Sequence, residues 1–356
     1  MNPYLAVVGL LLLTSTLIVL PLVPGLRELY RKSDASALSV IQQHTGEIRY
    51  FADSFRTYIK TLEPTLRECG ITGRTATGTM PDGTEYIVLG TSDGTQIPAP
   101  TETNHPALIA STADLSLPSE SIFSRDIYAC GKLTGGASNQ YRAVLAEKSV
   151  HLGEGSSVMR WVHAVAEFSA DPGCRLYGRV SSDRSIRLQA GCSFLRLNAP
   201  RIETGQGNAA ELHSPAAQAV APTPSVNTPL RLLHDGDFEI SAGQVFQGNL
   251  VVRGKLRIGA GARVYGSVKA DQELVLDAGA SVEGSLISAR NLLIGPQCTV
   301  YGPIIAERKM LIQTGTQCGR AENPTTVSAP RIEIAEGAVV FGSLWAREQG
   351  EVVARS

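Results

Sequence analysis

Residues 238–302 have the sequence FEISAGQVFQGNLVVRGKLRIGAGARVYGSVKADQELVLDAGASVEGSLISARNLLIGPQCTVYG. Similar residues recur in this stretch, and just beyond it, at intervals of 18. The columns are Gly248, Gly266, Gly284 and Gly302; Leu256, Leu274, Leu292 and Met310; Ile258, Leu276, Ile294 and Ile312; and Val264, Val282 and Val300. A period kept over several turns indicates stacked copies of one structural unit.

The spacing inside each repeat predicts what this unit is. Short apolar positions recur at every sixth residue, as at Ile258, Val264 and Ala270, which gives each repeat three sides. Apolar and polar residues alternate locally, as in short strands with one inward face. A helical repeat would need longer runs, of about ten residues or more, at period 3.6. We therefore predict an all-β fold, a parallel three-sided β-helix with 18-residue rungs.

The corners of this β-helix account for two kinds of small residue. We expect the glycine column that begins at Gly248 to lie at corners with positive φ. A second corner column is always small and should point into the core. Its members are Ser156, Cys174, Cys192, Ala262, Ala280, Cys298, Thr316 and Ala338. The cysteines are thus predicted to be core residues, with a disulfide between Cys174 and Cys192 left open. The six cysteines include no CxxC pair, and we predict no metal and no cofactor.

The repeat divides the chain into segments. The same signature at Gly155, Gly173 and Gly191 predicts a first β-helix array over 125–204. A Pro/Ala-rich linker follows at 205–235, then a second array at 236–348 and a polar tail at 349–356. The sequence APRIE occurs at Ala199 and again at Ala329, which suggests that the two arrays are duplicates.

The N-terminal region predicts a membrane anchor. The run from Tyr4 to Val23 carries no charge and is long enough to span a bilayer as one helix, so we assign 1–26 as a transmembrane anchor. A cleaved signal peptide is the alternative. Arg27, Arg31 and Lys32 follow the run, so the positive-inside rule places the rest of the chain in the cytoplasm.

Two further segments separate the anchor from the arrays. Apolar spacing at Phe51, Phe55 and Ile59 predicts a juxtamembrane amphipathic helix within 27–69. Its apolar face could lie on the bilayer, pair with a neighbouring copy or pack on the next domain. Residues 70–124, rich in Thr, Gly and Pro with only a short apolar run from Tyr86 to Leu89, are expected to be irregular, with a possible hairpin.

The repeat and the non-repetitive segment before it resemble the bactofilins, the polymer-forming cytoskeletal family of bacteria. The resemblance covers the C-terminal part of the chain, over the predicted second array. It implies a right-handed β-helix that polymerises end to end without nucleotide at the cytoplasmic face of the bacterial inner membrane. The implied partners are other copies of the chain, the lipid membrane through residues 4–23, and envelope or cell-wall proteins. A net charge of −1 gives no reason to expect nucleic-acid binding.

Two alternatives share the same hexad pattern. A left-handed β-helix acyltransferase would need a general base, usually histidine, yet no histidine follows His234, and neither His151 nor His163 has an obvious partner in the sequence. A carbohydrate-binding β-helix usually has stacked acidic and aromatic residues, which are scattered here. We therefore predict a scaffold protein that is not an enzyme, with no catalytic residue.

The C-terminal end of the second array is the predicted polymerisation interface. After Ala346 only REQGEVVARS remains, which is too short for a convincing capping helix. The last rung is therefore expected to present Phe341, Leu344 and Trp345 to the next molecule, because an open strand edge invites further pairing. The alternative is that Phe341 plugs the final turn of a monomer.

Overall fold

The computed structural model describes residues 9, 13–17, 19–23, 49–90, 95–96, 103–205 and 231–354. They belong to two units, Met1–Glu47 and Ile48–Ser356. In the first unit, a 3-10 helix, η1, spans Leu20–Leu22. No helix in the described ranges is long and apolar enough to cross a membrane. Much of the run from Tyr4 to Val23 lies outside the described residues.

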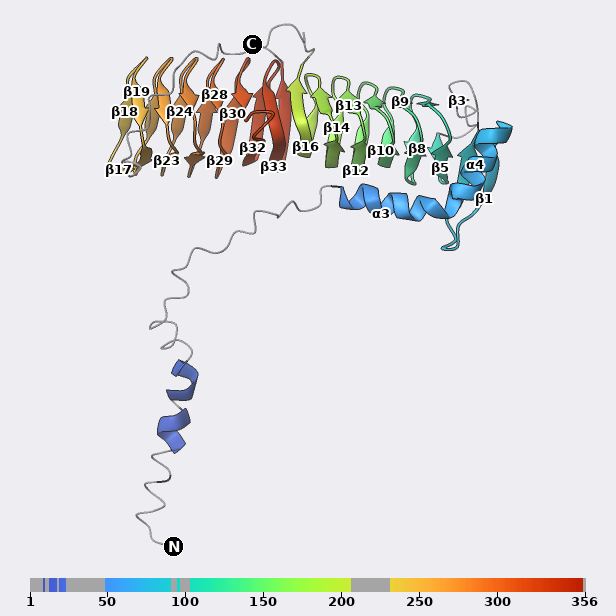
Figure 1. Cartoon of the computed structure of the whole chain (residues 1–356), viewed down its shortest axis with the longest axis horizontal. Coiled ribbons are helices and arrows are strands. Elements are labelled where there is room, and N and C mark those ends of the chain that lie inside the picture. Colours follow the sequence, from blue (N-terminus) through green and yellow to red (C-terminus); the bar gives the residue numbers. More distant parts are fainter. Residues whose placement is uncertain are drawn as a thin grey trace. The chain divides into compact units, whose positions relative to one another are not determined.

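The second unit is a parallel β-solenoid of about 13 turns (Figure 1). Its N-terminal array contains β1 (Ala76–Thr79), β2 (Glu85–Leu89), β3 (Thr95–Gln96), β4 (Asn104–His105), β5 (Leu108–Ser111), β6 (Leu115–Leu117), β7 (Ile122–Phe123), β8 (Ile127–Ala129), β9 (Leu133–Gly135), β10 (Gln140–Ala146), β11 (Val150–Leu152), β12 (Ser157–Ala164), β13 (Glu167–Ala170), β14 (Arg175–Ser182), β15 (Ser185–Leu188) and β16 (Ser193–Thr204).

The C-terminal array follows the linker. It contains β17 (Arg231–His234), β18 (Phe238–Ile240), β19 (Val245–Gln247), β20 (Asn249–Val252), β21 (Leu256–Ile258), β22 (Arg263–Tyr265), β23 (Val268–Ala270), β24 (Leu274–Leu276), β25 (Ser281–Val282), β26 (Leu286–Ser288), β27 (Leu292–Ile294), β28 (Thr299–Val300), β29 (Ile304–Ala306), β30 (Lys309–Ile312), β31 (Gln317–Cys318), β32 (Thr325–Ala335) and β33 (Val339–Val353).

The register of the strands confirms the predicted repeat. From β17 to β29 each strand pairs in parallel with the strand three places later, so that three strands make one rung, and at the end of the array β30 pairs with β32 and β31 with β33. Leu256 lies opposite Leu274, and Leu274 lies opposite Leu292, each one period later in the chain. Every column of inward residues therefore becomes a stack in one continuous core. The handedness of the coil stays a prediction.

The small corner column is buried throughout, as predicted. Cys174, Cys192 and Cys298 have no exposed surface, and Ala262 and Ala280 occupy the same position in other rungs. The Cys298 thiol donates a weak hydrogen bond to the carbonyl oxygen of Asp277, 3.0 Å away. All six cysteines are free, so Cys174 and Cys192 form no disulfide here.

The glycine column has a physical origin that was predicted only in part. Gly248 and Gly266 have positive φ, as expected, whereas Gly284 and Gly302 do not. A Cβ atom on Gly284 would lie 2.5 Å from the carbonyl oxygen of Gly266, one rung below, so close backbone stacking is what requires glycine there. A separate positive-φ corner lies just before the small column, and its occupants include Gly261, Gly279 and the non-glycine Gln297.

The solenoid also begins earlier than the sequence indicated. Residues 70–124, expected to be irregular, contain β1 to β7, and β5 already pairs in parallel with both β2 and β8. These strands are short, and positive φ is adopted in this part of the solenoid by Glu120 and Ser138 instead of glycine. The missing glycine signal conceals the repeat at this end, since strands equally short in the second array were recognised from their glycine and apolar columns.

The two arrays join through their last rungs. β16 pairs antiparallel with β33, with Leu197 opposite Leu344 and Asn198 opposite Ser343. Asn198 Nδ2 donates a hydrogen bond of 2.8 Å to Ser343 Oγ. Figure 1 shows the consequence, because the first array runs toward the junction from one side and the second array from the other. Much of the predicted polar tail, up to Val353, forms part of β33.

Helices pack on the first array. They are α3 (Tyr50–Ile59), η3 (Lys60–Leu62) and α4 (Glu63–Thr72). α3 runs along one side of the array, and α4 lies beside β1 at the N-terminal end of the solenoid (Figure 1). α3 buries Ala52, Phe55 and Ile59 in a second apolar cluster that includes Trp161 of β12. Of the three roles open for this helix, packing on the next domain is thus the one observed for its buried face.

Candidate functional surfaces

The predicted polymerisation interface lies at the junction of the two arrays. Leu344 is fully buried opposite Leu197. Trp345 is exposed, and the guanidinium of Arg196 lies 4.2 Å from its ring centroid. Phe341 is half-buried. In this structure the rung that carries these residues is therefore paired within the chain, although their role in polymerisation stays a prediction.

An open rung lies at the other end of the second array. β17, β18 and β19 pair only with β20, β21 and β22, so among the described residues nothing pairs with their outer edges. The inward residue Phe246 stacks over Val264 and is partly exposed, whereas Val264 is 1% exposed. Leu233 and Val245 are each 52% exposed. This end is an unpaired strand edge with uncovered apolar side chains.

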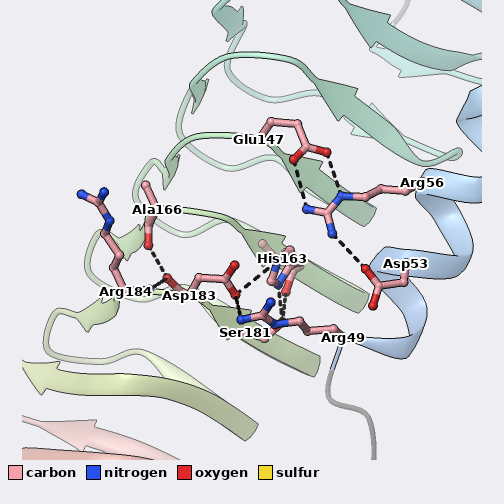
Figure 2. Close-up of polar contacts among 11 residues, drawn as sticks. Arg49, Asp53, Arg56, Glu147, His163, Ala166, Ser181, Asp183 and Arg184 are labelled. Atoms are coloured by element: carbon pink, nitrogen blue, oxygen red, sulfur yellow. Dashed lines mark hydrogen bonds and ion pairs between the residues drawn. The ribbon is translucent and has the colours of Figure 1, made fainter. Parts of the chain in front are cut away.

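Ion pairs attach helix α3 to the solenoid (Figure 2). Arg56 donates two hydrogen bonds, of 2.9 and 3.0 Å, to the carboxylate of Glu147, which follows β10. It also donates one of 3.0 Å to Asp53 of its own helix. Arg49, just before the helix, lies 2.7 Å from Asp183. A bidentate guanidinium pair fixes orientation as well as distance, so these contacts hold α3 in one place.

His163 lies beneath this cluster and is almost fully buried. Its Nδ1 atom lies 2.8 Å from Ser181 Oγ, and its Nε2 atom lies 3.7 Å from Asp183. Burial lowers the pKa of His163, because the apolar surroundings disfavour the charged ring. With 1% of its surface exposed, the side chain packs as a strand residue and presents almost nothing to a substrate.

His151 has a similar set of partners on the surface. Its Nδ1 atom lies 3.0 Å from Ser169 Oγ, and its Nε2 atom lies 3.3 Å from Asp171. The expectation that neither histidine has an obvious partner was therefore wrong. Ser169 and Ser181 each lie one 18-residue repeat after the histidine that they contact, so the repeat could have predicted both pairs. The same spacing places each histidine beside polar side chains of the neighbouring rung.

The described residues contain no group of three or more His, Cys, Asp or Glu side chains arranged to hold a metal ion. The prominent features of the described ranges are instead surfaces: an open strand edge, a fastened helix and a junction between arrays. Together these features define the class of the protein as a parallel β-solenoid whose second array ends in an unpaired strand edge.

Comparison with known families agrees with this class. The model of the bactofilin family, described as polymer-forming cytoskeletal, matches residues 239–344, and this part of the chain is a bactofilin domain. The first array lies upstream of the match and continues the same solenoid. Neither the curated proteins nor the solved structures include a match to the chain.

Proposed function

We propose that this protein is a membrane-tethered scaffold whose copies assemble through the open rung of the second array. The family description supports self-assembly, since the matched domain belongs to a polymer-forming cytoskeletal family. The single observation that selects the surface is the unpaired edge of β17, β18 and β19.

The energetics of this edge favour docking. The inward side chains Leu232, Phe238 and Phe246 are partly exposed, whereas Leu250, Leu256 and Val264, one rung on, are at most 1% exposed. Burying such groups is worth about 25 cal/mol for each Å² of apolar surface removed from water. Pairing the edge would also satisfy backbone donors and acceptors of the first rung.

The junction inside the chain offers a mode for this contact. β16 and β33 show that two end rungs of this solenoid can pair antiparallel with a continuous core between them. A second copy docking on β17 in the same manner would give a two-fold symmetric, head-to-head pair, which closes at two copies and serves as the unit that further contacts would join into a polymer.

The tether part of the proposal rests on sequence. The uncharged run from Tyr4 to Val23 followed by Arg27, Arg31 and Lys32 supports a single-pass anchor with the solenoid in the cytoplasm, at a bacterial inner membrane. Envelope and cell-wall proteins are the proposed clients. Removal of residues 1–24 should move the protein into the soluble fraction, and continued membrane pelleting after a carbonate wash would contradict the tether.

The assembly surface is tested by two matched variants of the full chain, Phe246→Arg and Phe341→Arg. An arginine at position 246 places an unpaired charge on the docking edge, where its desolvation opposes contact. We expect sedimentation and negative-stain microscopy to show assembly for the wild type and for Phe341→Arg, and monomers for Phe246→Arg. A monomeric wild type, or loss of assembly only in Phe341→Arg, would sink the proposal and favour the C-terminal rung.

A further inference from the structure

Exposed apolar side chains gather at one place on the solenoid. Between residues 49 and 354, nine large apolar side chains of the described residues are exposed. Four of them are Phe51, Met159, Tyr177 and Trp345, at 38%, 55%, 48% and 38% exposure. A fifth, Tyr50, has its ring centroid 5.6 Å from that of Phe51. Two others, Leu233 and Val245, belong to the open rung, so most of the exposed apolar side chains beyond that rung lie at this one patch.

The fold brings these side chains together from several elements. Phe51 comes from the first turn of α3, whereas Met159 and Tyr177 occupy the same position in successive rungs of β12 and β14. β16 and β33 extend the surface across the array junction. We call the set formed by Phe51, Met159, Tyr177, Trp345, Arg179 and Arg196 the arginine–aromatic patch.

The patch is positively charged. Arg179 places its guanidinium 4.9 Å from the Phe51 ring centroid, and Arg196 lies over Trp345. The groove between them is lined by three arginines, Arg160 included, and by no Asp or Glu. Elsewhere on this protein, arginines such as Arg56, Arg257 and Arg331 pair with carboxylates. Of the three arginines, Arg160 acts electrostatically on the half-buried Asp126, so the exposed positive charge of the patch comes from Arg179 and Arg196. Exposed apolar side chains gathered in one patch mark a surface that binds a partner or a membrane.

We propose that the arginine–aromatic patch docks on an anionic lipid bilayer, with the arginines on headgroup phosphates and the aromatic and methionine side chains in the interfacial layer. Aromatic rings favour the headgroup level, and arginine pairs with phosphate in bidentate fashion. Each cationic side chain near an anionic bilayer contributes about 1 kcal/mol, or roughly a fivefold change in the docking equilibrium.

The connection of the patch to the proposed membrane anchor supports a lipid bilayer as its binding partner. The inference rests on the proposed tether, because the apolar run ends at Val23 and α3 begins at Tyr50. The chain between these two positions reaches at most about 100 Å, so an anchored chain keeps the patch at high effective concentration near the bilayer. A two-fold contact with a second copy is less favourable, because it would bring identical arginine clusters against each other.

The chain supplies its own probe for this contact. Its two tryptophans, Trp161 and Trp345, both belong to this region of the surface. We would reconstitute the full chain in vesicles of phosphatidylcholine alone, or with phosphatidylglycerol added, and measure flotation together with quenching of tryptophan fluorescence by brominated lipid. The test variant is Arg179→Gln with Arg196→Gln. The matched control is Arg263→Gln, an exposed arginine of the second array.

We expect flotation with both vesicles, and quenching only with phosphatidylglycerol and at low salt. In the double variant the docked-to-undocked ratio should fall about 25-fold, at fivefold for each arginine, while the control stays unchanged. Flotation without any lipid-dependent quenching would overturn the patch and leave the tether standing. Quenching and flotation confined to anionic vesicles would support the patch and contradict the tether.

Two results would count against the patch in another way. A blue shift that grows with protein concentration in the absence of lipid would show that a second copy covers it. Failure to float with either vesicle would overturn both proposals.

Discussion

The junction between the two arrays depends on one glycine whose replacement tests it. Gly350 of β33 lies opposite Phe194 of β16, although the two residues are far apart in the chain. A Cβ atom on Gly350 would lie 2.2 Å from Cε2 of the Phe194 ring. The ring is 2% exposed and belongs to the main core, so it has little space in which to move.

The magnitude follows from packing. Gly350→Ala should cost about 1–3 kcal/mol, as overpacking of a filled core does. Phe194→Leu should cost less than the roughly 3–5 kcal/mol of a full truncation to alanine. In the double variant the smaller side chain makes room for the new methyl group, so its loss of stability should be smaller than the sum by about 0.5–3 kcal/mol.

The assay is thermal and urea unfolding of the full chain, followed by circular dichroism for the wild type and the three variants. A change of about 1 kcal/mol should move the melting temperature by roughly 2 °C in a protein of this size. Strict additivity, or a neutral Gly350→Ala, would show that the last rungs of the arrays are not in contact in solution.

Three further predictions address α3, buried histidine and rung stacking. Arg56→Ala and Glu147→Ala should show a coupling of about 1 kcal/mol in a double-mutant cycle of thermal unfolding, because the pair is bidentate and partly buried; zero coupling would mean that α3 is not fastened there. Since burial lowers the pKa of His163, the unfolded chain binds a proton that the folded chain does not, so stability should fall as pH drops below about 6.5. His163→Gln should lessen that loss between about pH 7 and pH 5, and an unchanged pH profile would contradict it. Gly284→Val should destabilise by several kcal/mol through its clash with the rung below, whereas Cys298→Ala should cost about 1 kcal/mol or less; similar melting temperatures for both would refute the stacking argument.

The sequence predicted what a fixed period can encode. A column such as Leu256, Leu274 and Leu292 specifies strand register, because each residue must lie over its equivalent to stay inside. The small corner column was predictable for the same reason. The positions of the glycine column were predicted correctly, but positive φ explains only some of them. A period does not distinguish a glycine required by positive φ from one required by close backbone stacking.

The period carries no information about how one array meets another. Antiparallel pairing of β16 with β33 joins residues at unrelated separations, and the predicted open end around Leu344 was consequently paired inside the chain. One signal was available. The repeated APRIE at Ala199 and Ala329 places the same sequence in β16 and β32, near the meeting ends of both arrays.

The positions of the two proposed surfaces imply that both can be occupied at once and that each acts independently of the other. The arginine–aromatic patch is formed by residues of α3, β12, β14, β16 and β33, and the open rung of β17 to β19 lies at the far end of the second array (Figure 1). Because neither surface covers the other, docking on lipid leaves the assembly edge free. A variant such as Phe246→Arg should therefore lose assembly while its tryptophan quenching by anionic vesicles stays intact, and loss of both would show that the bilayer holds an assembled form only.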